Sequence, residues 1–315
     1  MKLAIILNST DKILMASRYK YTKLLKYIYG NAVEIFDERY FNKVRLFKPD
    51  YCVVFGSFRK TFQYPLTYGM PYILCDHDIQ SMYRPGESSD EHKKIKNAKK
   101  IIFTSPDHQK YICDKYSIPK ENTIVIYLRP SKEDLDFESL EKLPGKNLVY
   151  IGGLLDNTFP THTQGRFAYR CYADIFKDIM VQGWGVHLYA ARKRPEIYSK
   201  IGCIYHQRFN EGKDLFKELS QYTAGLQGFG IVNGSFEYAK TCRPNKIWNY
   251  LAGNIPTIGI NPGNGIELYE GKWGYELKEI AKINELDFNK LDLSKYRQEE
   301  LIENQSEELQ KFIEN

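Results

Sequence analysis

Short apolar runs recur at regular intervals along this 315-residue chain, and they leave few folds open to it. Each run has the length of a buried strand, and a helix-length or loop segment separates it from the next run. The runs are residues 2–7, 32–36, 51–55, 72–75, 99–104 and 123–128 in the first half, and 147–151, 185–190, 203–205, 224–226 and 257–260 in the second. Strands that alternate with helices favour parallel, doubly wound sheets, so the sequence predicts the α/β class.

A proline and glycine cluster at Leu143-Pro144-Gly145-Lys146 marks the best candidate for a domain boundary, because it follows an acidic polar stretch. The chain is long enough for two domains of ordinary size, and its 43% hydrophobic content can fill two cores. We therefore expect domains at residues 1–143 and 147–290, followed by a C-terminal segment at 291–315. An amphipathic helix is predicted there over residues 298–312. Its apolar side should consist of Leu301, Ile302, Leu309 and Phe312.

The composition argues against several classes of protein. Six cysteines lie far apart without a C-x-x-C pair, which disfavours a zinc site or a disulfide framework and favours free thiols in a reducing cytoplasm. No apolar run approaches the ~18 residues of a membrane-spanning helix, and the apolar run near the N-terminus is too short for a secretory signal. The net charge of +6 suits an anionic partner such as nucleic acid, a membrane surface or a phosphorylated substrate. A lysine-rich coding bias is the alternative explanation of that charge.

The stretch from Arg243 to Ile260 predicts a helix packed beside a short buried strand. Pro244 can begin the helix at no cost in hydrogen bonds, and Gly253-Asn254 can end it in a left-handed cap. Lys246 and Asn249 then share a side of the helix that does not face the core. A cation and an amide on one open face can hold a polar ligand.

A glycine-rich loop at residues 226–235 precedes this helix. Glycines permit positive φ angles and a close approach of the backbone to a ligand. A loop of this kind that leads into a helix can bind phosphate through unpaired N–H groups and the helix dipole. A glycine loop that only turns the chain is the alternative.

Two polar segments of the first half follow predicted strands, where open α/β sheets bind their ligands. The first is Asn8-Ser9, directly after the first strand. The second begins at Asp76-His77-Asp78 and continues to Arg84. Two carboxylates that flank an imidazole can act as acid, base or ligand, and a polar loop without chemistry is the alternative.

The helix of the second half resembles the donor-site helix of the GT-B glycosyltransferases, and of the large retaining family in particular. The shared pattern is Pro244-x-Lys246-x-x-Asn249-Tyr250-Leu251-Ala252 followed by a turn and Pro256, where the family has P-x-K-x-x-E-Y-x-A-x-G-x-P. The resemblance implies two Rossmann-like doubly wound domains that face a central cleft, with the terminal helix packed back across both. It also places Lys246 near the diphosphate of a nucleotide sugar, and it puts Asn249 where the family has a ribose-binding glutamate.

The same resemblance extends to other positions. His77-Asp78 is similar to the His-Asp pair that retaining enzymes place against the donor sugar, and both are our catalytic candidates. The donor-binding candidates are Gly152, Gly153, Arg166, Arg192, Gly230, Arg243, Lys246, Asn249 and Tyr250. The acceptor-side candidates are Asn8, Ser9 and Arg84. Around His77 the sequence also resembles phage α-glucosyltransferases that modify hydroxymethylcytosine in DNA.

These resemblances predict a cytoplasmic, metal-independent and retaining glycosyltransferase that moves a sugar from a UDP-sugar to an acceptor hydroxyl and needs no cofactor. A hydroxymethylated base in double-stranded DNA is the favoured acceptor, with Lys93, Lys94, Lys96, Lys99 and Lys100 as candidate phosphate ligands. A cell-envelope glycan or lipid is the alternative acceptor. A non-catalytic binding protein, a nucleotide-sugar epimerase, and a metal-dependent enzyme that uses Asp76-x-Asp78 as a D-x-D motif are the alternative functions.

Overall fold

The computed structural model describes most of the chain, and its described residues form two compact units. Described are residues 1–7, 16–56, 61–77, 79, 82, 88–155, 170–190, 194–207, 209–210, 212–230, 241, 245–263 and 265–315. Unit 1 comprises Met1–Ser131 and Leu301–Asn315, and unit 2 comprises Lys132–Glu300.

Unit 1 is built on a six-stranded parallel sheet in the order β2-β1-β3-β4-β5-β6. Its strands are β1 (Leu3–Leu7), β2 (Val33–Asp37), β3 (Tyr51–Gly56), β4 (Tyr72–Asp76), β5 (Lys100–Phe103) and β6 (Thr123–Val125). The inner strands are buried almost throughout, because helices cover both faces of a parallel sheet. This confirms the predicted α/β class for the first half of the chain.

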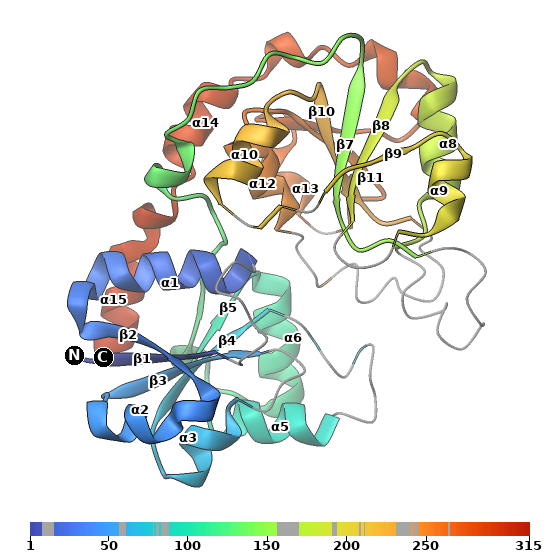
Figure 1. Ribbon diagram of the computed structural model, residues 1–315. Coiled ribbons are helices and arrows are strands. Elements are labelled where there is room, and N and C mark those ends of the chain that lie inside the picture. The colour runs from blue at the N-terminus through green and yellow to red at the C-terminus, as the bar shows by residue number, and fades with distance from the viewer. Residues whose placement is uncertain are drawn as a thin grey trace. The chain divides into compact units, whose positions relative to one another are not determined.

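Helices flank the sheet of unit 1 on both sides. They are α1 (Ala16–Tyr29), α2 (Phe41–Phe47), α3 (Gln63–Thr67), α5 (Ser88–Lys96), α6 (Pro106–Tyr116) and α15 (Ser306–Glu314), with 3-10 turns at Gly30–Ala32, Glu38–Tyr40, Lys120–Asn122 and Ile302–Gln305. In Figure 1, α1 and α15 lie on one side of this sheet, and α2, α3 and α5 lie on the other. Helix α1 directs cations inward: Lys20 is buried and its Nζ donates to the carbonyl of Leu128 at 2.8 Å.

Unit 2 contains a second six-stranded parallel sheet, in the order β12-β11-β10-β7-β8-β9. Its strands are β7 (Asn147–Gly152), β8 (Gly185–Ala190), β9 (Ile204–Tyr205), β10 (Ala224–Gly228), β11 (Thr257–Ile260) and β12 (Gly274–Glu276). The helices are α8 (Ala173–Val181), α9 (Glu196–Lys200), α10 (Lys213–Leu219), α12 (Lys246–Ala252), α13 (Ile266–Tyr269) and α14 (Leu293–Glu299), with 3-10 turns at Lys132–Leu135, Ile280–Glu285 and Phe288–Lys290.

Alternate residues of β7 enter two separate cores, as the period of a strand requires. Leu148 and Tyr150 belong to the core beneath α8 and α9, whereas Val149 belongs to the core beneath α10 and α12. The two helix pairs accordingly lie on opposite flanks of the sheet in Figure 1. Both faces of β7 are buried, which explains its uninterrupted apolar sequence.

The division between the units falls earlier than the predicted boundary at residues 143–147. The segment before β7 is bonded to the loop after α10: Leu143 N–H donates to the carbonyl of Gln221 at 2.9 Å, and Lys142 Nζ donates to that of Tyr222 at 2.7 Å. The polar stretch before the Pro-Gly pair is therefore part of unit 2.

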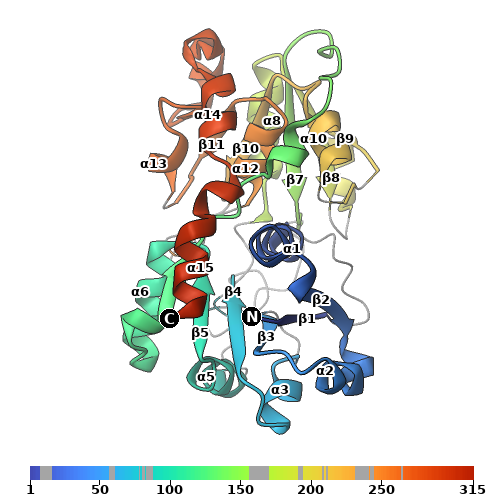
Figure 2. The same cartoon turned by 90° about the vertical axis from the view of Figure 1, so that its left-hand side faces the viewer.

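The C-terminal segment differs from the continuous helix predicted over residues 298–312. Helix α14 ends at Glu299, and Leu301 is extended with ψ 147°. The N–H of Ile302 then donates to the carbonyl of Pro130 at 2.8 Å, which draws the chain into unit 1 before α15 begins. The view in Figure 2 shows α14 and α15 as separate helices. Of the predicted apolar side, Ile302 and Leu309 are buried, while Phe312 is only partly buried.

Candidate functional site

Each sheet has a point where the chain changes direction, and ligands of open α/β sheets bind at the carboxyl ends of the strands there. In unit 2 the chain runs from β7 to β8 and β9 on one side, and then returns to β10 on the other side of β7. The carboxyl ends of β7 and β10 therefore define a candidate site. In unit 1 the corresponding point lies between β1 and β3.

The turn after β7 is held by a tyrosine of the same strand. The hydroxyl of Tyr150 donates to the carbonyl of Gly153 at 3.1 Å. Gly152 has φ 148°, and a Cβ at this position would come 3.0 Å from the Tyr150 hydroxyl. A Cβ on Gly153 would come 3.1 Å from a guanidinium nitrogen of Arg170. The two predicted donor-site glycines therefore let the backbone turn tightly between a tyrosine and an arginine.

The turn after β10 also depends on glycine. Gly228 has φ 149°, and a Cβ there would lie 1.7 Å from the carbonyl oxygen of Ile260. A Cβ on Gly230 would lie 1.8 Å from the carbonyl oxygen of Cys171. The hydroxyl of Tyr172 donates to the carbonyl of Gly228 at 2.6 Å. The backbone is thus closely packed on both sides, which only glycine allows.

Lys246 is the first residue of α12, and its Nζ lies 4.0 Å from the centre of the Tyr150 ring. The lysine is partly exposed, whereas Asn249 on the next turn is 4% exposed, so the prediction that both residues lie on an open side of the helix is wrong for Asn249. Gly152, Gly153, Gly230 and Lys246 therefore belong to the elements that meet at the β7 and β10 strand ends. Such an arrangement offers the cation of Lys246 and several close backbone segments to an anion.

Tyr250 fixes α12 to the sheet of unit 2. Its side chain is completely buried, its hydroxyl donates to the carbonyl of Leu226 at 2.8 Å, and the N–H of Ile151 donates to that hydroxyl at 3.4 Å. Burial raises the pKa of the Tyr250 hydroxyl, which keeps it protonated as a donor. Gly225 provides space for the ring, since a Cβ there would lie 2.3 Å from it. Tyr250 thus joins β7, β10 and α12.

The end of α12 differs in detail from the predicted cap. Gly253 has φ −70°, and the left-handed residue is Asn254 with φ 55°. Gly253 is needed for space instead, because a Cβ there would lie 2.8 Å from the Cβ of Leu219 on α10. Asparagine tolerates the left-handed conformation better than most residues, so the cap remains intact.

In unit 1, the candidate catalytic residue His77 directly follows β4 and is partly buried. The preceding residue, Asp76, is fully buried. Lys94 Nζ lies 3.0 Å from one carboxylate oxygen of Asp76, and His108 Nε2 lies 3.1 Å from the other. Burial alone would raise the pKa of Asp76, but the charges and hydrogen bonds of Lys94 and His108 outweigh it and lower the pKa to about 2. Asp76 is therefore a buried carboxylate anion.

Comparison with solved structures identifies the fold. No protein-family model and no curated protein matches the sequence. HepE of Anabaena, determined with UDP-glucose, has a TM-score of 0.65 at 13% identity over 99% of each chain. The UDP-forming trehalose-phosphate synthase of Burkholderia xenovorans, determined with glucose-6-phosphate, has a TM-score of 0.63 at 8% identity over all of both chains. A glycosyltransferase of Rickettsia africae has a TM-score of 0.61 at 9% identity over 99% of this chain and 98% of that one.

The chain has the GT-B fold. This confirms the fold predicted from the resemblance of the helix after Arg243. Unit 2 contains six of the predicted donor-binding residues, namely Gly152, Gly153, Gly230, Lys246, Asn249 and Tyr250. Seven other predicted site residues lie outside the described residues, namely Asn8, Ser9, Asp78, Arg84, Arg166, Arg192 and Arg243.

The D-x-D alternative conflicts with the environment of its first carboxylate. Asp76 is fully buried, and both of its oxygens lie within ion-pair distance of a basic side chain. A metal ion at Asp76 would have to displace Lys94 or His108 and leave it unpaired in the core. Among the residues that the structure describes, no cluster of three His, Cys, Asp or Glu side chains is arranged to hold a metal.

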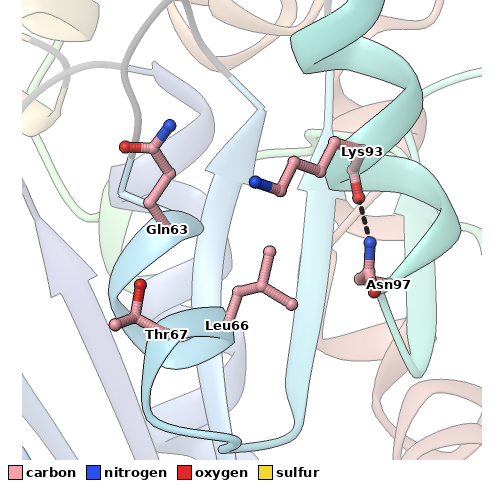
Figure 3. A pocket seen from close by; sticks show the side chains of 5 residues that line it. All are labelled: Gln63, Leu66, Thr67, Lys93 and Asn97. Atoms are coloured by element: carbon pink, nitrogen blue, oxygen red, sulfur yellow. Dashed lines mark hydrogen bonds between the residues drawn. The ribbon is translucent and has the colours of Figure 1, made fainter.

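The five proposed DNA-phosphate lysines differ in exposure: Lys93, Lys96 and Lys99 are exposed, whereas Lys94 is buried and Lys100 is partly buried. Lys94 is buried against Asp76, so its prediction as a phosphate ligand is wrong. Lys100 is partly buried: its Nζ donates to the carbonyl of Phe312 at 2.6 Å, and burial lowers its pKa. Lys93 lines a hollow of about 550 Å³ with Asn97, Gln63, Leu66 and Thr67, and Figure 3 shows its amino group extending from α5 toward α3.

Several residues that shape these sites were not among the predicted site residues. Tyr150 was predicted only as part of the strand over residues 147–151, Tyr172 had no predicted role, and Lys94 was predicted as a phosphate ligand rather than as the partner of Asp76. For Tyr150 a usable signal was its position two residues before the Gly152-Gly153 turn.

Within the described part of the chain, no helix is both long and apolar enough to cross a bilayer.

Proposed function

We propose that this protein is a glycosyltransferase that moves a sugar from a nucleoside diphosphate sugar to an acceptor hydroxyl, with UDP as the nucleotide. The observation that carries the proposal is Lys246, which begins a helix beside two glycine turns at the switch point of the unit 2 sheet. HepE shares the fold and was determined with UDP-glucose and with UDP, which supports the choice of donor.

The chemistry requires stabilisation of the leaving diphosphate. As the glycosidic bond breaks, negative charge grows on the phosphate oxygen that leaves, and a fixed cation or N–H donor lowers the barrier. Lys246 supplies the cation, while the backbone N–H groups of the turns after β7 and β10, which Gly152, Gly153 and Gly230 allow to form, are the candidate donors to the phosphates. We propose that this unit binds the donor, with Asn249 hydrogen-bonded to the ribose and Tyr250 holding the helix in place.

His77 is the proposed catalytic group of unit 1. It follows β4 directly, so the buried Asp76 anion with its two basic partners fixes the strand end from which His77 projects. We propose that His77 hydrogen-bonds to the transferred sugar or the acceptor hydroxyl. We further propose that transfer proceeds with retention and without a metal ion, since Lys246 can perform the charge neutralisation that a metal performs elsewhere.

The test is a donor and acceptor screen. The protein is incubated with UDP-, dTDP- and GDP-sugars, with and without EDTA, and with sugar, lipid and plain or hydroxymethylated DNA acceptors, and the products are identified by mass. We expect nucleotide release from one donor that EDTA does not reduce, together with a sugar-sized mass gain on one acceptor class. Absence of both hydrolysis and transfer with every donor would contradict the proposal.

A further inference from the structure

We propose that Tyr150 is a positioning residue for Lys246, and that its ring sets the affinity of the protein for the diphosphate of its donor. This inference rests on the proposed function and adds a residue to it. Tyr150 is on β7 and Lys246 begins α12, yet the ammonium nitrogen lies 4.0 Å from the ring centre. An ammonium within about 6 Å of a ring centre is attracted by the ring quadrupole.

The neighbour of Lys246 is a ring face rather than a carboxylate in the described part of the chain. This difference matters for an anion-binding cation. A carboxylate would hold the ammonium but would also cancel its charge and repel a phosphate. A tyrosine ring attracts the ammonium without adding net negative charge. Lys246 can therefore be held in place and still present its full charge to a diphosphate.

The ring itself is firmly fixed. Tyr150 is 2% exposed, and its ring centre lies 4.7 Å from that of Tyr172 and 5.8 Å from that of Phe176. Its hydroxyl is bonded to the carbonyl of Gly153 after β7, and the hydroxyl of Tyr172 is bonded to the carbonyl of Gly228 after β10. The two packed tyrosines thus link the lysine to both glycine turns.

Fixing Lys246 lowers the cost of binding. A lysine side chain has four rotatable bonds and loses considerable conformational entropy when a ligand immobilises it. Because the ring already restricts the ammonium in the free protein, part of that loss occurs before the donor arrives. Replacing the ring should therefore weaken diphosphate binding even though Tyr150 itself is buried and does not need to touch the ligand.

The experiment measures the Kd for UDP by isothermal titration calorimetry. Tyr150→Leu removes the ring face, and Tyr150→Phe keeps it but loses the bond to Gly153. We expect Tyr150→Leu to raise the Kd roughly three- to tenfold, because the loss of about 1 kcal/mol of attraction implies a change of that size. The Kd of Tyr150→Phe should stay within about twofold of the wild-type value. The matched control is Tyr205→Leu on β9, where Arg194 lies over the ring at 5.7 Å on an edge strand. It should leave the Kd unchanged.

A series of fluorinated phenylalanines at position 150 separates positioning from packing. Fluorines weaken the quadrupole of the ring while nearly preserving its shape, so the Kd should rise steadily with each fluorine added. This series also carries the test if the Leu variant fails to fold. A Kd that does not change along the series would overturn the inference about Tyr150. The proposed function would still stand in that case, provided that the wild-type protein binds UDP. Failure of the wild-type protein to bind UDP, ADP, GDP or dTDP would overturn both.

Discussion

Lys94 and Asp76 form an ion pair with 3.0 Å between Nζ and Oδ1, and both side chains are almost completely buried in unit 1. Asp76 ends β4, and Lys94 lies on α5, which begins beyond the segment that contains His77. The pair therefore anchors both ends of the segment between them. Gly56 on β3 leaves space for it, since a Cβ there would lie 2.0 Å from the carboxylate of Asp76.

Removing one partner of this pair should be costly. Lys94→Met leaves the Asp76 carboxylate buried with only His108 beside it, so we expect the free energy of unfolding to fall by about 3–5 kcal/mol. Urea denaturation followed by circular dichroism measures the change. The matched control is Lys110→Met, which breaks an exposed pair with Asp114 and should change stability by less than about 0.5 kcal/mol. Similar small losses in both variants would show that the buried pair does not anchor the fold.

Gly225 should be intolerant of a side chain although its backbone is an ordinary strand. Gly225→Ala places a Cβ about 2.3 Å from the Tyr250 ring, so the ring and α12 must move. We expect a loss of about 1–3 kcal/mol from overpacking, and weaker donor binding because Lys246 moves with the helix. The control is Gly69→Ala, because no atom lies within 4 Å of a Cβ at that position. Its cost should be about 1 kcal/mol and should come only from the positive φ of 64°. Thermal unfolding distinguishes the two, and an equal, small loss would contradict the packing described for Tyr250.

Acid should weaken unit 2 through His187. His187 Nε2 lies 3.0 Å from Asn147 Oδ1, and because that oxygen can only accept, Nε2 carries the proton and donates it. In the neutral ring His187 Nδ1 must then accept from His206 Nε2 at 2.8 Å. Burial and the neighbouring His206 lower the pKa of His187 from 6.5 to about 4. The unfolded chain thus binds a proton at a higher pH than the folded one. The stability that neutral His187 contributes is fully present above pH 6.5. The free energy of unfolding should then fall by about 1–3 kcal/mol between pH 6.5 and 4.

The measurement for this prediction is the midpoint of urea unfolding across pH 4 to 8. His187→Gln should flatten the profile between pH 6.5 and 4, whereas His92→Gln, at an exposed position on α5, should not. The loss from protonating Asp76 occurs at lower pH, from its ordinary value of 3.8 down to about 2, so it does not overlap. An unchanged slope in His187→Gln would refute the assignment.

The alternation of strands and helices was predictable because parallel strands buried on both faces have continuous apolar sequences. Thr257–Ile260 and Gly185–Ala190 were predicted with the boundaries observed. The short strand β12 was missed, since three residues, Gly274–Glu276, have no apolar run to mark them. The Pro-Gly turn at 144–145 is a local signal for a boundary, whereas the division into units depends on distant bonds such as that of Leu143 to Gln221.

The candidate site was predictable only in part. A lysine and an asparagine on one face of a helix are local signals, so Lys246 could be proposed from its spacing, whereas Gly152 and Gly153 were proposed from the resemblance to GT-B enzymes. The pairing of Tyr150 with Lys246 and of Lys94 with Asp76 joins residues far apart in the chain. Local sequence contains no information on such contacts. A lysine on a charged helix resembles a surface residue, and only the packing of α5 against β4 reveals that Lys94 is buried.

The most direct test of the central claim is the release of UDP from a UDP-sugar by the wild-type protein, Lys246→Ala and Lys272→Ala. Lys272 is a lysine of the same unit whose Nζ donates to the carbonyl of Glu267, so it serves as the matched control. We predict that Lys246→Ala lowers the rate roughly 100-fold or more, as loss of one stabilising group at a developing anion does, and that Lys272→Ala stays within about twofold. Equal rates for all three proteins would contradict the assignment of Lys246 to the leaving diphosphate.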